Sequence, residues 1–238
     1  MPYADPIELT LAENWLWTLR DVSLAGECLV LDQANTLAFA SAWSPIRQAM
    51  GIQDVLAFSD DVEQWLDDNI QRYDGGAFIR TGFGMPKECP FAYAPVRSTQ
   101  EAIGVLRWPD SRLGKYALAR VQNDDPVSIV VRPWVDMDRG REFRVFVEDN
   151  RFRGACPLYP EAHRRIDEAD ALSALKTLVA AVNESAPLSS YVADAVLLQS
   201  GVARLIELNP FIPSTDSILF SWTGDDMDGR FRLSQPAA

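Results

Sequence analysis

The feature that most restricts the fold is a pair of apolar segments near the C-terminus, each of which contains a carboxylate. Residues 191–198 and 203–208 are rich in apolar side chains, and Ser200-Gly201 between them has the composition of a tight turn. This pattern predicts an antiparallel hairpin. Asp194 lies near the start of the first segment and Glu207 near the end of the second, so the hairpin would place them side by side. A carboxylate embedded in apolar strands is costly unless it is paired or bound to a metal.

Asn209 adds a third oxygen-bearing side chain to this pattern. It follows Glu207 by two residues, and alternate residues of a strand point to the same face. Two carboxylates and an amide carbonyl are hard oxygen ligands of the kind that Mg²⁺ prefers. Asp194, Glu207 and Asn209 are therefore candidate metal ligands. The residues alone leave a second interpretation open, in which the carboxylates cap strand ends or lie on an exposed edge.

The rest of the second half predicts another hairpin and a helix. Residues 142–148 alternate polar and apolar side chains, and Asp149-Asn150 is a turn signal before residues 151–153. Residues 167–182 carry leucines and valines at helical spacing. Two strands, one helix and two more strands are typical of an α+β layout with helices packed on antiparallel sheets.

The first half predicts a mixture of helices and short strands. Residues 60–73 carry apolar side chains at i, i+3, i+4 and i+8, which predicts an amphipathic helix. Ser98-Thr99-Gln100-Glu101 matches a capping box that opens a helix. We place a boundary before the apolar segment 127–135. Residues 1–126 would then form an N-terminal region with a first lobe, and residues 127–238 a second lobe with the metal site.

Composition excludes several classes of function. The net charge is −12, with 22 Lys and Arg against 34 Asp and Glu, and no basic stripe of the kind that binds nucleic acid is visible. No apolar run approaches the roughly 18–20 residues needed to span a bilayer. The N-terminus lacks the pattern of a secretory signal. We expect no nucleic-acid or membrane partner and a cytoplasmic location. The single histidine, His163, excludes a metal site built on two histidines.

The sequence around Asn209 resembles a known family. Residues 207–211 (ELNPF) and 215–222 (TDSILFSW) are similar to the C-terminal signature of the Cell division cycle protein 123 family, approximately acid-x-Asn-Pro-Phe, a short loop, Thr-Asp-Ser-Leu-Leu-Phe, a small residue and Trp. Residues 132–135 and 142–147 resemble the family's Arg-x-Trp and Glu-Phe-Arg-x-Phe-Val elements. Order and spacing agree from Val127 to the end, which makes the chain similar to a short, bacterial-type member.

The resemblance implies a divergent ATP-grasp fold, in which two α+β lobes hold Mg-ATP in a cleft between antiparallel sheets flanked by helices. ATP and Mg²⁺ are thus the implied cofactors. Asp194, Glu207 and Asn209 would hold magnesium against the β- and γ-phosphates. Glu207 replaces the family's commoner Asp, which changes reach but not charge.

Two cations of the first lobe would reach the phosphates in this family. They are Arg80 and Lys87, which lie in stretches similar to family elements at residues 78–80 and 85–88. A lysine in a loop beside Gly82 and Gly84 lets a point charge and backbone amides approach an anion together. A solvated loop lysine is the alternative, because the glycine spacing is not that of a P-loop.

The strand that passes between the lobes in this family would contact the nucleotide through Arg132. Pro133 offers no N–H, so a hydrogen bond to adenine must come from Trp134 or from a carbonyl. The Trp134 ring would either wall the adenine pocket or belong to the core.

Glu142 and Arg144 share one face of their predicted strand. Arg144 beside a triphosphate would help neutralise developing charge. The alternatives are an internal Glu142–Arg144 pair or a solvated face. Asp216, in the Thr-Asp-Ser loop, would serve turn capping or catalysis. The implied catalytic residues are Arg144 and Lys87, and the implied nucleotide-binding set is Arg80, Lys87, Arg132, Trp134, Glu142 and Arg144.

Two functions follow from the resemblance. The first is an ATP-grasp ligase that joins a carboxylate to an amine on a peptide or protein, with release of ADP and phosphate. The second is an assembly factor that binds a protein partner and uses ATP as a clamp without turnover, since the family's eukaryotic members help to assemble a translation initiation factor. Residues 154–158 depart from the family's Gly-x-Ser-Gln-Arg-like stretch.

Overall fold

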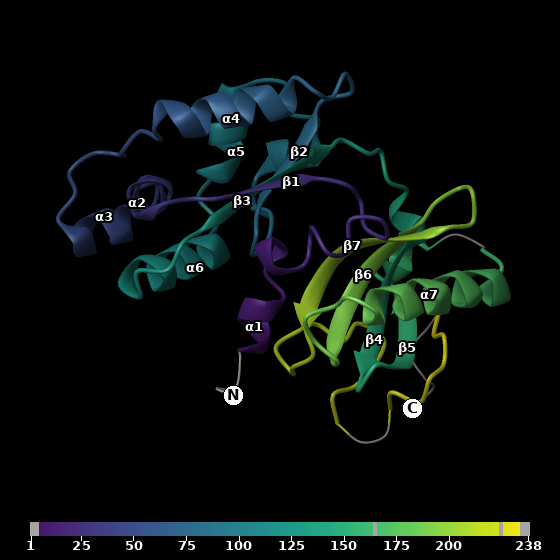
Figure 1. Ribbon diagram of the computed structural model, residues 1–238. Helices are drawn as coiled ribbons and strands as arrows, with labels where there is room; N and C mark the ends of the chain where they lie inside the picture. Colours follow the sequence, from purple (N-terminus) through teal and green to yellow (C-terminus); the bar gives the residue numbers. More distant parts are fainter. Residues whose placement is uncertain (1–4, 164–165, 224–225, 234–238) are drawn as a thin grey trace. The chain divides into compact units, whose positions relative to one another are not determined.

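Two antiparallel sheets, one of three strands and one of four, organise the residues that the structure describes (Figure 1). The chain divides into two compact units. One is Ala25–Val135, and the other combines Met1–Leu24 with Asp136–Ala238. Each unit contains one of the sheets. The structure is a computed structural model that describes residues 5–163, 166–223 and 226–233.

The unit Ala25–Val135 is built on the sheet of order β1-β3-β2, in which both neighbouring pairs are antiparallel. Helix α4 packs against β3, α5 packs against β2, and α2 packs against α6. Its elements are β1 (Glu27–Val30), α2 (Gln33–Ala40), α3 (Ser44–Met50), α4 (Asp60–Ile70), β2 (Ala77–Thr81), η2 (Pro90–Tyr93), α5 (Thr99–Leu106), α6 (Ser111–Gln122) and β3 (Ser128–Pro133).

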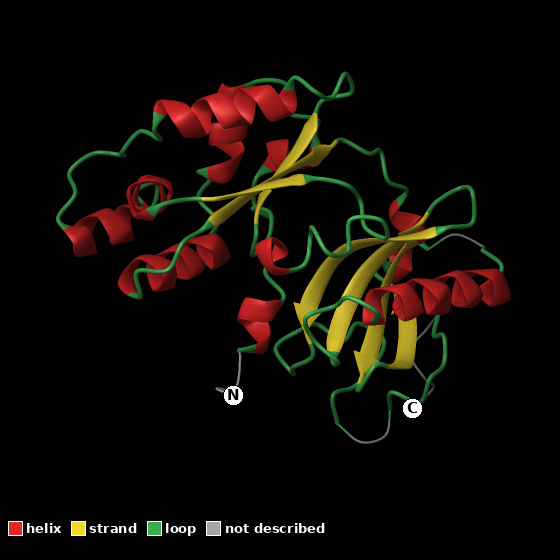
Figure 2. Ribbon diagram, viewed as in Figure 1, coloured by secondary structure: helices red, strands yellow, loops and turns green. Residues whose placement is uncertain are grey.

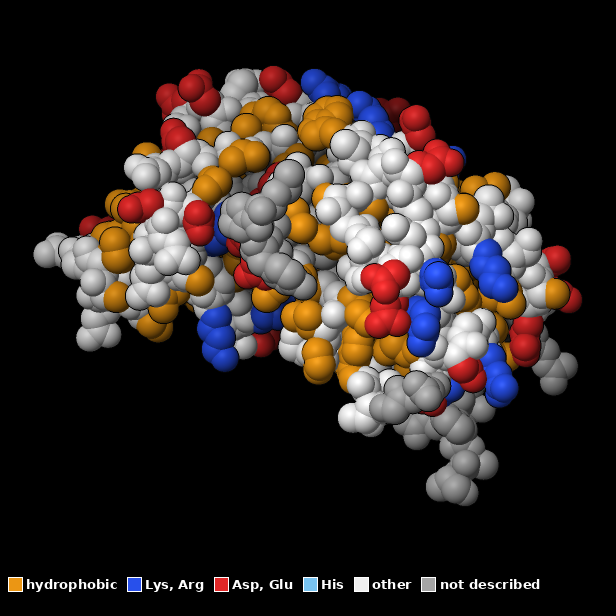
Figure 3. Space-filling model, turned by 60° about the horizontal axis from the view of Figure 1, so that its bottom comes forward, with side chains coloured by type: hydrophobic (Ala, Val, Ile, Leu, Met, Phe, Trp, Pro, Cys, Tyr) orange, Lys and Arg blue, Asp and Glu red, His pale blue; other side chains and the backbone are white. Residues whose placement is uncertain are grey.

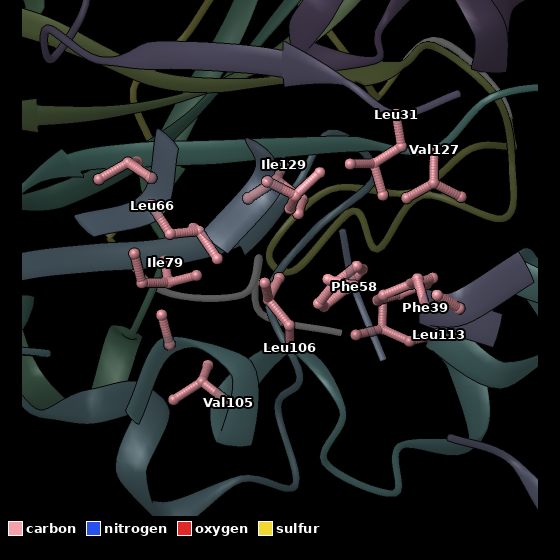
Figure 4. Packing of buried hydrophobic residues seen from close by; sticks show 14 of the residues in the cluster. Leu31, Phe39, Phe58, Leu66, Ile79, Val105, Leu106, Leu113, Val127 and Ile129 are labelled. Atoms are coloured by element: carbon pink, nitrogen blue, oxygen red, sulfur yellow. The ribbon is translucent and has the colours of Figure 1, made fainter. Parts of the chain in front are cut away.

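The core of this unit joins the sheet to its helices (Figure 4). Ile79 and Ile129 of the sheet belong to the same buried cluster as Leu66 of α4 and Leu106 of α5. The predicted amphipathic helix is confirmed as α4, which ends at Ile70 rather than at residue 73. The predicted capping box is also confirmed at its first position, because the Ser98 hydroxyl accepts a hydrogen bond from the N–H of Glu101 at 3.2 Å.

The position of β3 differs from the lobe boundary that we placed before residue 127. Val130 of β3 pairs with Cys28 of β1 on one side and with Arg80 of β2 on the other, so β3 is the central strand of the first sheet. The N-terminal residues instead group with the C-terminal half, where the N–H of Leu24 donates to the carbonyl of Leu205 at 2.9 Å. Local hydrophobic patterning does not specify which strand a segment pairs with. For this reason the sequence did not show that residues 128–133 belong to the same sheet as β1 and β2.

The other unit is built on the sheet of order β5-β4-β6-β7, with all neighbours antiparallel. Helix α7 lies along one face of this sheet and contacts β5, β6 and β7 (Figure 2). Among the described helices, none is long and apolar enough to cross a bilayer. The elements of this unit are α1 (Pro6–Leu9), η1 (Ala12–Asn14), η3 (Arg139–Arg141), β4 (Glu142–Glu148), β5 (Arg151–Pro157), η4 (Pro160–Ala162), α7 (Glu168–Asn183), β6 (Tyr191–Leu197) and β7 (Ala203–Pro210).

Both predicted hairpins of this unit are present. Asp149 and Asn150 have φ angles of 51° and 60°, the left-handed values that a two-residue turn of type I′ requires. In the β6–β7 hairpin, Asp194 lies directly opposite Glu207, as predicted. A register shift follows Asp194, so that Ala195 pairs with Leu205.

The chain beyond β7 covers part of the sheet. Residues 211–223, here called the covering segment, contribute Leu219 and Phe220 to a buried cluster with Phe146 of β4 and Val192 of β6. The candidate site lies on the same sheet face, because Phe146 and Val192 lie two residues from its members.

Candidate functional site

One row of directly paired residues crosses the four-stranded sheet. Arg144 of β4 lies between Cys156 of β5 and Asp194 of β6. Glu207 of β7 then faces Asp194. Side chains of directly opposed residues lie on the same face, and Asn209 joins them because it is two residues from Glu207. The row therefore brings together the three predicted metal ligands and one predicted catalytic residue.

Arg144 and Asp194 form a buried bidentate ion pair. The Nε and Nη2 atoms of Arg144 donate to the two carboxylate oxygens of Asp194, each at 2.7 Å. The residues are 9% and 3% exposed. Two parallel hydrogen bonds between a guanidinium and a carboxylate form the strongest common ion-pair geometry. Arg144 thus pairs across the sheet with Asp194, and not along its own strand with Glu142.

Asn209 links the two carboxylates of the row. Its Nδ2 atom donates to Oδ2 of Asp194 at 3.3 Å and to Oε1 of Glu207 at 3.4 Å. Both distances are long for an amide donor, so each bond is weak. The amide orientation nevertheless places the nitrogen of Asn209, rather than its oxygen, toward the two acids.

Arg144 and Asp194 are buried, and their removal from water changes their pKa values. Burial raises the pKa of Asp194, Arg144 opposes the rise, and Glu207 adds to it through its charge and a hydrogen bond. Burial alone would lower the pKa of Arg144, but Asp194, with smaller contributions from Glu207 and Asp216, more than offsets this, and the pKa is raised. Burial also raises the pKa of the Cys156 thiol, to about 11.

Glu142 opens β4 and is buried at the edge of the row, with 7% exposure. Burial, followed by the charge of Asp194, raises the pKa of Glu142 to about 7. Arg139 opposes this shift, while Glu207 contributes to it. Glu142 therefore changes charge near neutral pH beside two other acids.

Asp216 caps a turn. Its carboxylate accepts a hydrogen bond from the N–H of Ile218 at 2.9 Å, and its side chain is otherwise exposed. Its carbonyl oxygen accepts the remaining contact of Arg144, from Nη1 at 2.7 Å. The geometry therefore favours the turn-capping interpretation of Asp216.

The first-lobe cations lie in the unit Ala25–Val135. Arg80 is buried, and its Nε and Nη2 atoms donate to the carbonyls of the next two residues at 3.0 and 3.4 Å. It therefore holds the start of the glycine-containing loop. Arg112 of α6 holds the middle of that loop by donating to the carbonyl of Met85 at 2.8 Å. Lys87, further along the same loop, is exposed.

Arg132 lies on the same face of the three-stranded sheet as Arg80. Phe78 pairs with Arg132 and Arg80 pairs with Val130, so the two arginines are diagonal neighbours. Arg132 is 3% exposed. Gly26 makes room for it, because a Cβ atom at Gly26 would lie 2.6 Å from Cγ of Arg132.

The main chain of Trp134 does not offer the donor that we considered for adenine. Its N–H donates to the carbonyl oxygen of Gly76 at 2.9 Å, which extends the pairing of Ala77 with Pro133. A hydrogen bond between adenine and the main chain here would therefore have to use a carbonyl oxygen. The Trp134 residue is half-buried, so its ring is neither fully in the core nor fully exposed.

The donor set of the row fits magnesium in its chemistry. Asp194 and Glu207 are carboxylates in register, and mutual repulsion between them would be relieved by a cation. Asn209 supplies the third oxygen only after its amide rotates, since its nitrogen now faces the acids. Within the described ranges, no group of three or more His, Cys, Asp and Glu residues could by itself hold a metal ion. A magnesium ion here would therefore rely on the amide, phosphate oxygens and water as well.

Sequence reasoning missed two features of this site. Cys156 lies opposite Arg144 because the β4–β5 pairing shifts register between Phe146 and Val147, and the repeat of alternating residues does not show such a shift. The carbonyl of Asp216 contacts Arg144 through backbone geometry. The only sequence signal for it was the turn-forming character of the Thr-Asp-Ser stretch.

The charged surface is mixed. On the face drawn in Figure 3, Lys and Arg side chains lie in small separate groups among acidic and apolar ones. A continuous basic stripe does not appear on that face among the described residues.

Comparison with solved structures defines the class of fold. The chain matches "Structure of Cdc123 from Schizosaccharomyces pombe" with a TM-score of 0.73 and 17% identity, over 95% of this chain and 96% of that chain. A C-terminally truncated form of the same protein matches with a TM-score of 0.72 and 17% identity, over 98% of each chain. The chain therefore shares the α+β fold of these two structures, as the resemblance led us to expect, and its ATP-grasp character is what that resemblance implies.

Sequence comparison finds similar proteins for part of the chain. Residues 113–228, slightly less than half of the chain, match the family model described as D123, so this stretch has the D123 sequence pattern. The "Translation initiation factor eIF2 assembly protein" of Danio rerio is 33% identical over 98 residues, which is 40% of this chain and 28% of that protein. The "Cell division cycle protein 123" of Eremothecium gossypii is 30% identical over 115 residues, 44% of this chain and 31% of that protein.

These matches have a limited extent. The chain spans about a third of the length of these two curated relatives. Both relatives come from eukaryotes, so the expected bacterial type gains no support from them.

Proposed function

We propose that this chain binds Mg-ATP on its four-stranded sheet and acts as an ATP-dependent assembly factor for a protein partner. The observation that carries the proposal is the row formed by the buried Arg144 and Asp194 and the half-buried Glu207, with Asn209 beside it. Acids and a cation buried together in a sheet face are costly unless a ligand or a fixed pairing uses them.

In this proposal Asp194, Glu207 and Asn209 hold the magnesium ion. When bound, the ion would supply positive charge that offsets the negative charge of the phosphates. Arg144 holds Asp194 in place before binding, through two bonds of 2.7 Å. Glu142, with a pKa of about 7, changes the charge around the site as pH rises.

The first-lobe residues have two different roles in this proposal. Lys87 is exposed and offers a mobile charge to the phosphates. Arg80 donates to the backbone of its own loop, so we assign it to positioning that loop. Arg132 and the Trp134 ring remain proposed nucleotide contacts.

An assembly factor is favoured over the ligase that we first expected. The relatives that match this chain include proteins named for eIF2 assembly, which supports a protein partner and, with it, a cytoplasmic location.

The test measures phosphate release by the full chain with Mg-ATP, and nucleotide binding in the same preparation. We expect Mg-ATP to bind with no phosphate release above the buffer rate. Retention of a purified candidate partner should require Mg-ATP and should be lost in Glu207→Gln. Steady phosphate release that rises with an added amine or peptide acceptor would contradict the assembly factor and restore the ligase.

A further inference from the structure

The guanidinium of Arg144 connects the metal-site strand to the covering segment. Its Nε and Nη2 atoms donate to Asp194, and its Nη1 atom donates to the carbonyl oxygen of Asp216, all at 2.7 Å. Every nitrogen of the guanidinium thus holds one of two partners on different elements. These bonds use three of the five N–H groups. At 9% exposure the side chain has little access to solvent, so a ligand as large as a triphosphate reaches the guanidinium most readily by displacing one of these partners.

The turn that Arg144 holds is under strain. Ile218 has a φ angle of 55°, in the left-handed region that a β-branched residue rarely adopts. The turn is closed by the Asp216 carboxylate on the N–H of Ile218 at 2.9 Å and by the Ser217 hydroxyl on the carbonyl of Phe220 at 2.7 Å. A strained backbone persists only where its surroundings hold it, and Arg144 is one of those contacts.

Other contacts tie down the ends of the covering segment. The Thr215 hydroxyl donates to the carbonyl of Pro210 at 2.6 Å, and the indole N–H of Trp222 donates to the carbonyl of Thr215 at 2.8 Å. The ring of Trp222 also packs edge-on against Phe211. Loss of the Arg144 contact would therefore loosen the turn at residues 216–218 without detaching the segment.

A divalent cation and a polyphosphate act on Arg144 in the same direction. A cation at Asp194 repels the guanidinium and competes for the carboxylate oxygens that it holds. Phosphate oxygens beside the cation offer the guanidinium the bidentate partner for which its shape is suited. Both effects draw Arg144 away from its present contacts.

We propose that Arg144 is a coupling residue: Mg-ATP binding at Asp194 and Glu207 withdraws its guanidinium from the Asp216 carbonyl and loosens the turn at residues 216–218. This inference rests on the proposed function and adds a regulation of the same site. The covering segment would then present a different surface to a protein partner in the nucleotide-bound state than in the free state.

The test is hydrogen–deuterium exchange of the full chain, with and without Mg-ATP, read on peptides from residues 211–223. Calorimetry on the same samples establishes that Mg-ATP is bound. We expect exchange in these peptides to become about threefold faster or more with Mg-ATP, because a local opening costs less once the Arg144 contact is gone.

Two variants sharpen this test. Arg144→Lys keeps the charge but lacks the planar fork, so we expect its nucleotide-free exchange to resemble that of wild type with Mg-ATP, with no further rise. Arg232→Lys is the matched control. Arg232 contacts Asp226 at 2.6 Å and lies over the ring of Phe220, outside the row, so the nucleotide-dependent rise should persist.

The outcomes separate this inference from the proposed function. Unchanged or slower exchange at residues 211–223, in samples where calorimetry detects bound Mg-ATP, would overturn the coupling and leave the proposed function standing. Failure of Mg-ATP to bind at all would overturn both.

Discussion

At the scale of single residues, the structure depends on the fact that Arg144 and Asp194 are buried together. Each holds the other's charge in a region with little water, at 9% and 3% exposure. Removing one member of such a pair leaves an uncompensated charge, whereas replacing both by apolar groups need cost little. Single and double variants can therefore measure separately what the ion pair contributes to stability and what it contributes to binding.

We predict that Arg144→Ala lowers the free energy of unfolding by about 3–5 kcal/mol, because Asp194 would be left buried and unpaired. The double variant Arg144→Met, Asp194→Leu should recover most of this loss while remaining unable to bind Mg-ATP. Urea denaturation measures the stability of both variants, and calorimetry measures whether the double variant binds Mg-ATP. A double variant no more stable than Arg144→Ala would show that the loss comes from packing and not from the stranded charge.

Glu142 gives a prediction about pH. Its pKa rises from 4.5 to about 7 on folding, so the folded state takes up the proton more readily. The contribution of Glu142 to the stability of the folded state is fully present below pH 4.5 and is lost as pH rises through 7. Glu142→Gln should therefore match wild type at pH 4 and be more stable at pH 8, by on the order of 2 kcal/mol in urea denaturation without added metal.

The control for this prediction is Glu148→Gln at the other end of the same strand. The Glu148 side chain is 43% exposed and lies 3.5 Å from Nε of Arg153. We expect no comparable gain at pH 8 for this variant. An equal gain in both variants would mean that the overall negative charge of the chain, and not burial of Glu142, causes the effect.

At the scale of elements, the covering segment lies so close to the sheet that β5 needs a glycine. A Cβ atom at Gly154 would lie 2.6 Å from Cζ of Phe220, and the φ angle of Gly154 is 155°. The segment contributes Phe220 to the cluster that contains Phe146, Cys156 and Val192. The strand and the segment therefore constrain each other.

Gly154→Ala should destabilise the protein by about 2 kcal/mol, through the clash with Phe220 and the unfavourable backbone angle. Gly104→Ala is the matched control. Gly104 lies within α5 with no neighbouring atom within 4 Å of an added Cβ, so this change should stabilise the protein by about 0.5–1 kcal/mol. Thermal unfolding measures the stability of both variants. Destabilisation of equal size in both would contradict the account of Gly154.

At the scale of the whole molecule, the sequence predicted local elements better than their partners. The 3.6-residue period of α4, the turn at Asp149-Asn150 and the facing positions of Asp194 and Glu207 are properties of neighbouring residues, and the structure contains them. The assignment of β3 to the first sheet depends on pairing across about 100 residues of chain. No local pattern encodes such pairing.

The same division holds for the candidate site. Asp194, Glu207 and Asn209 were found from one hairpin, and they lie together. The partner of Arg144 was not found, because Glu142 is near in sequence while Asp194 is opposite in space. The main-chain donor of Trp134 was considered for adenine, but it pairs with Gly76. In each case the pairing of strands determines which groups lie together.

The central claim is that the row on the four-stranded sheet is a magnesium-dependent ATP site. The most direct test is calorimetric titration of the full chain with ATP, with magnesium and again with a chelator in its place, on wild type and Glu207→Gln. The account predicts binding that requires magnesium and that weakens by about tenfold or more in the variant, since a ligand of the ion is lost. Absence of binding, or binding of equal strength with the chelator, would contradict it.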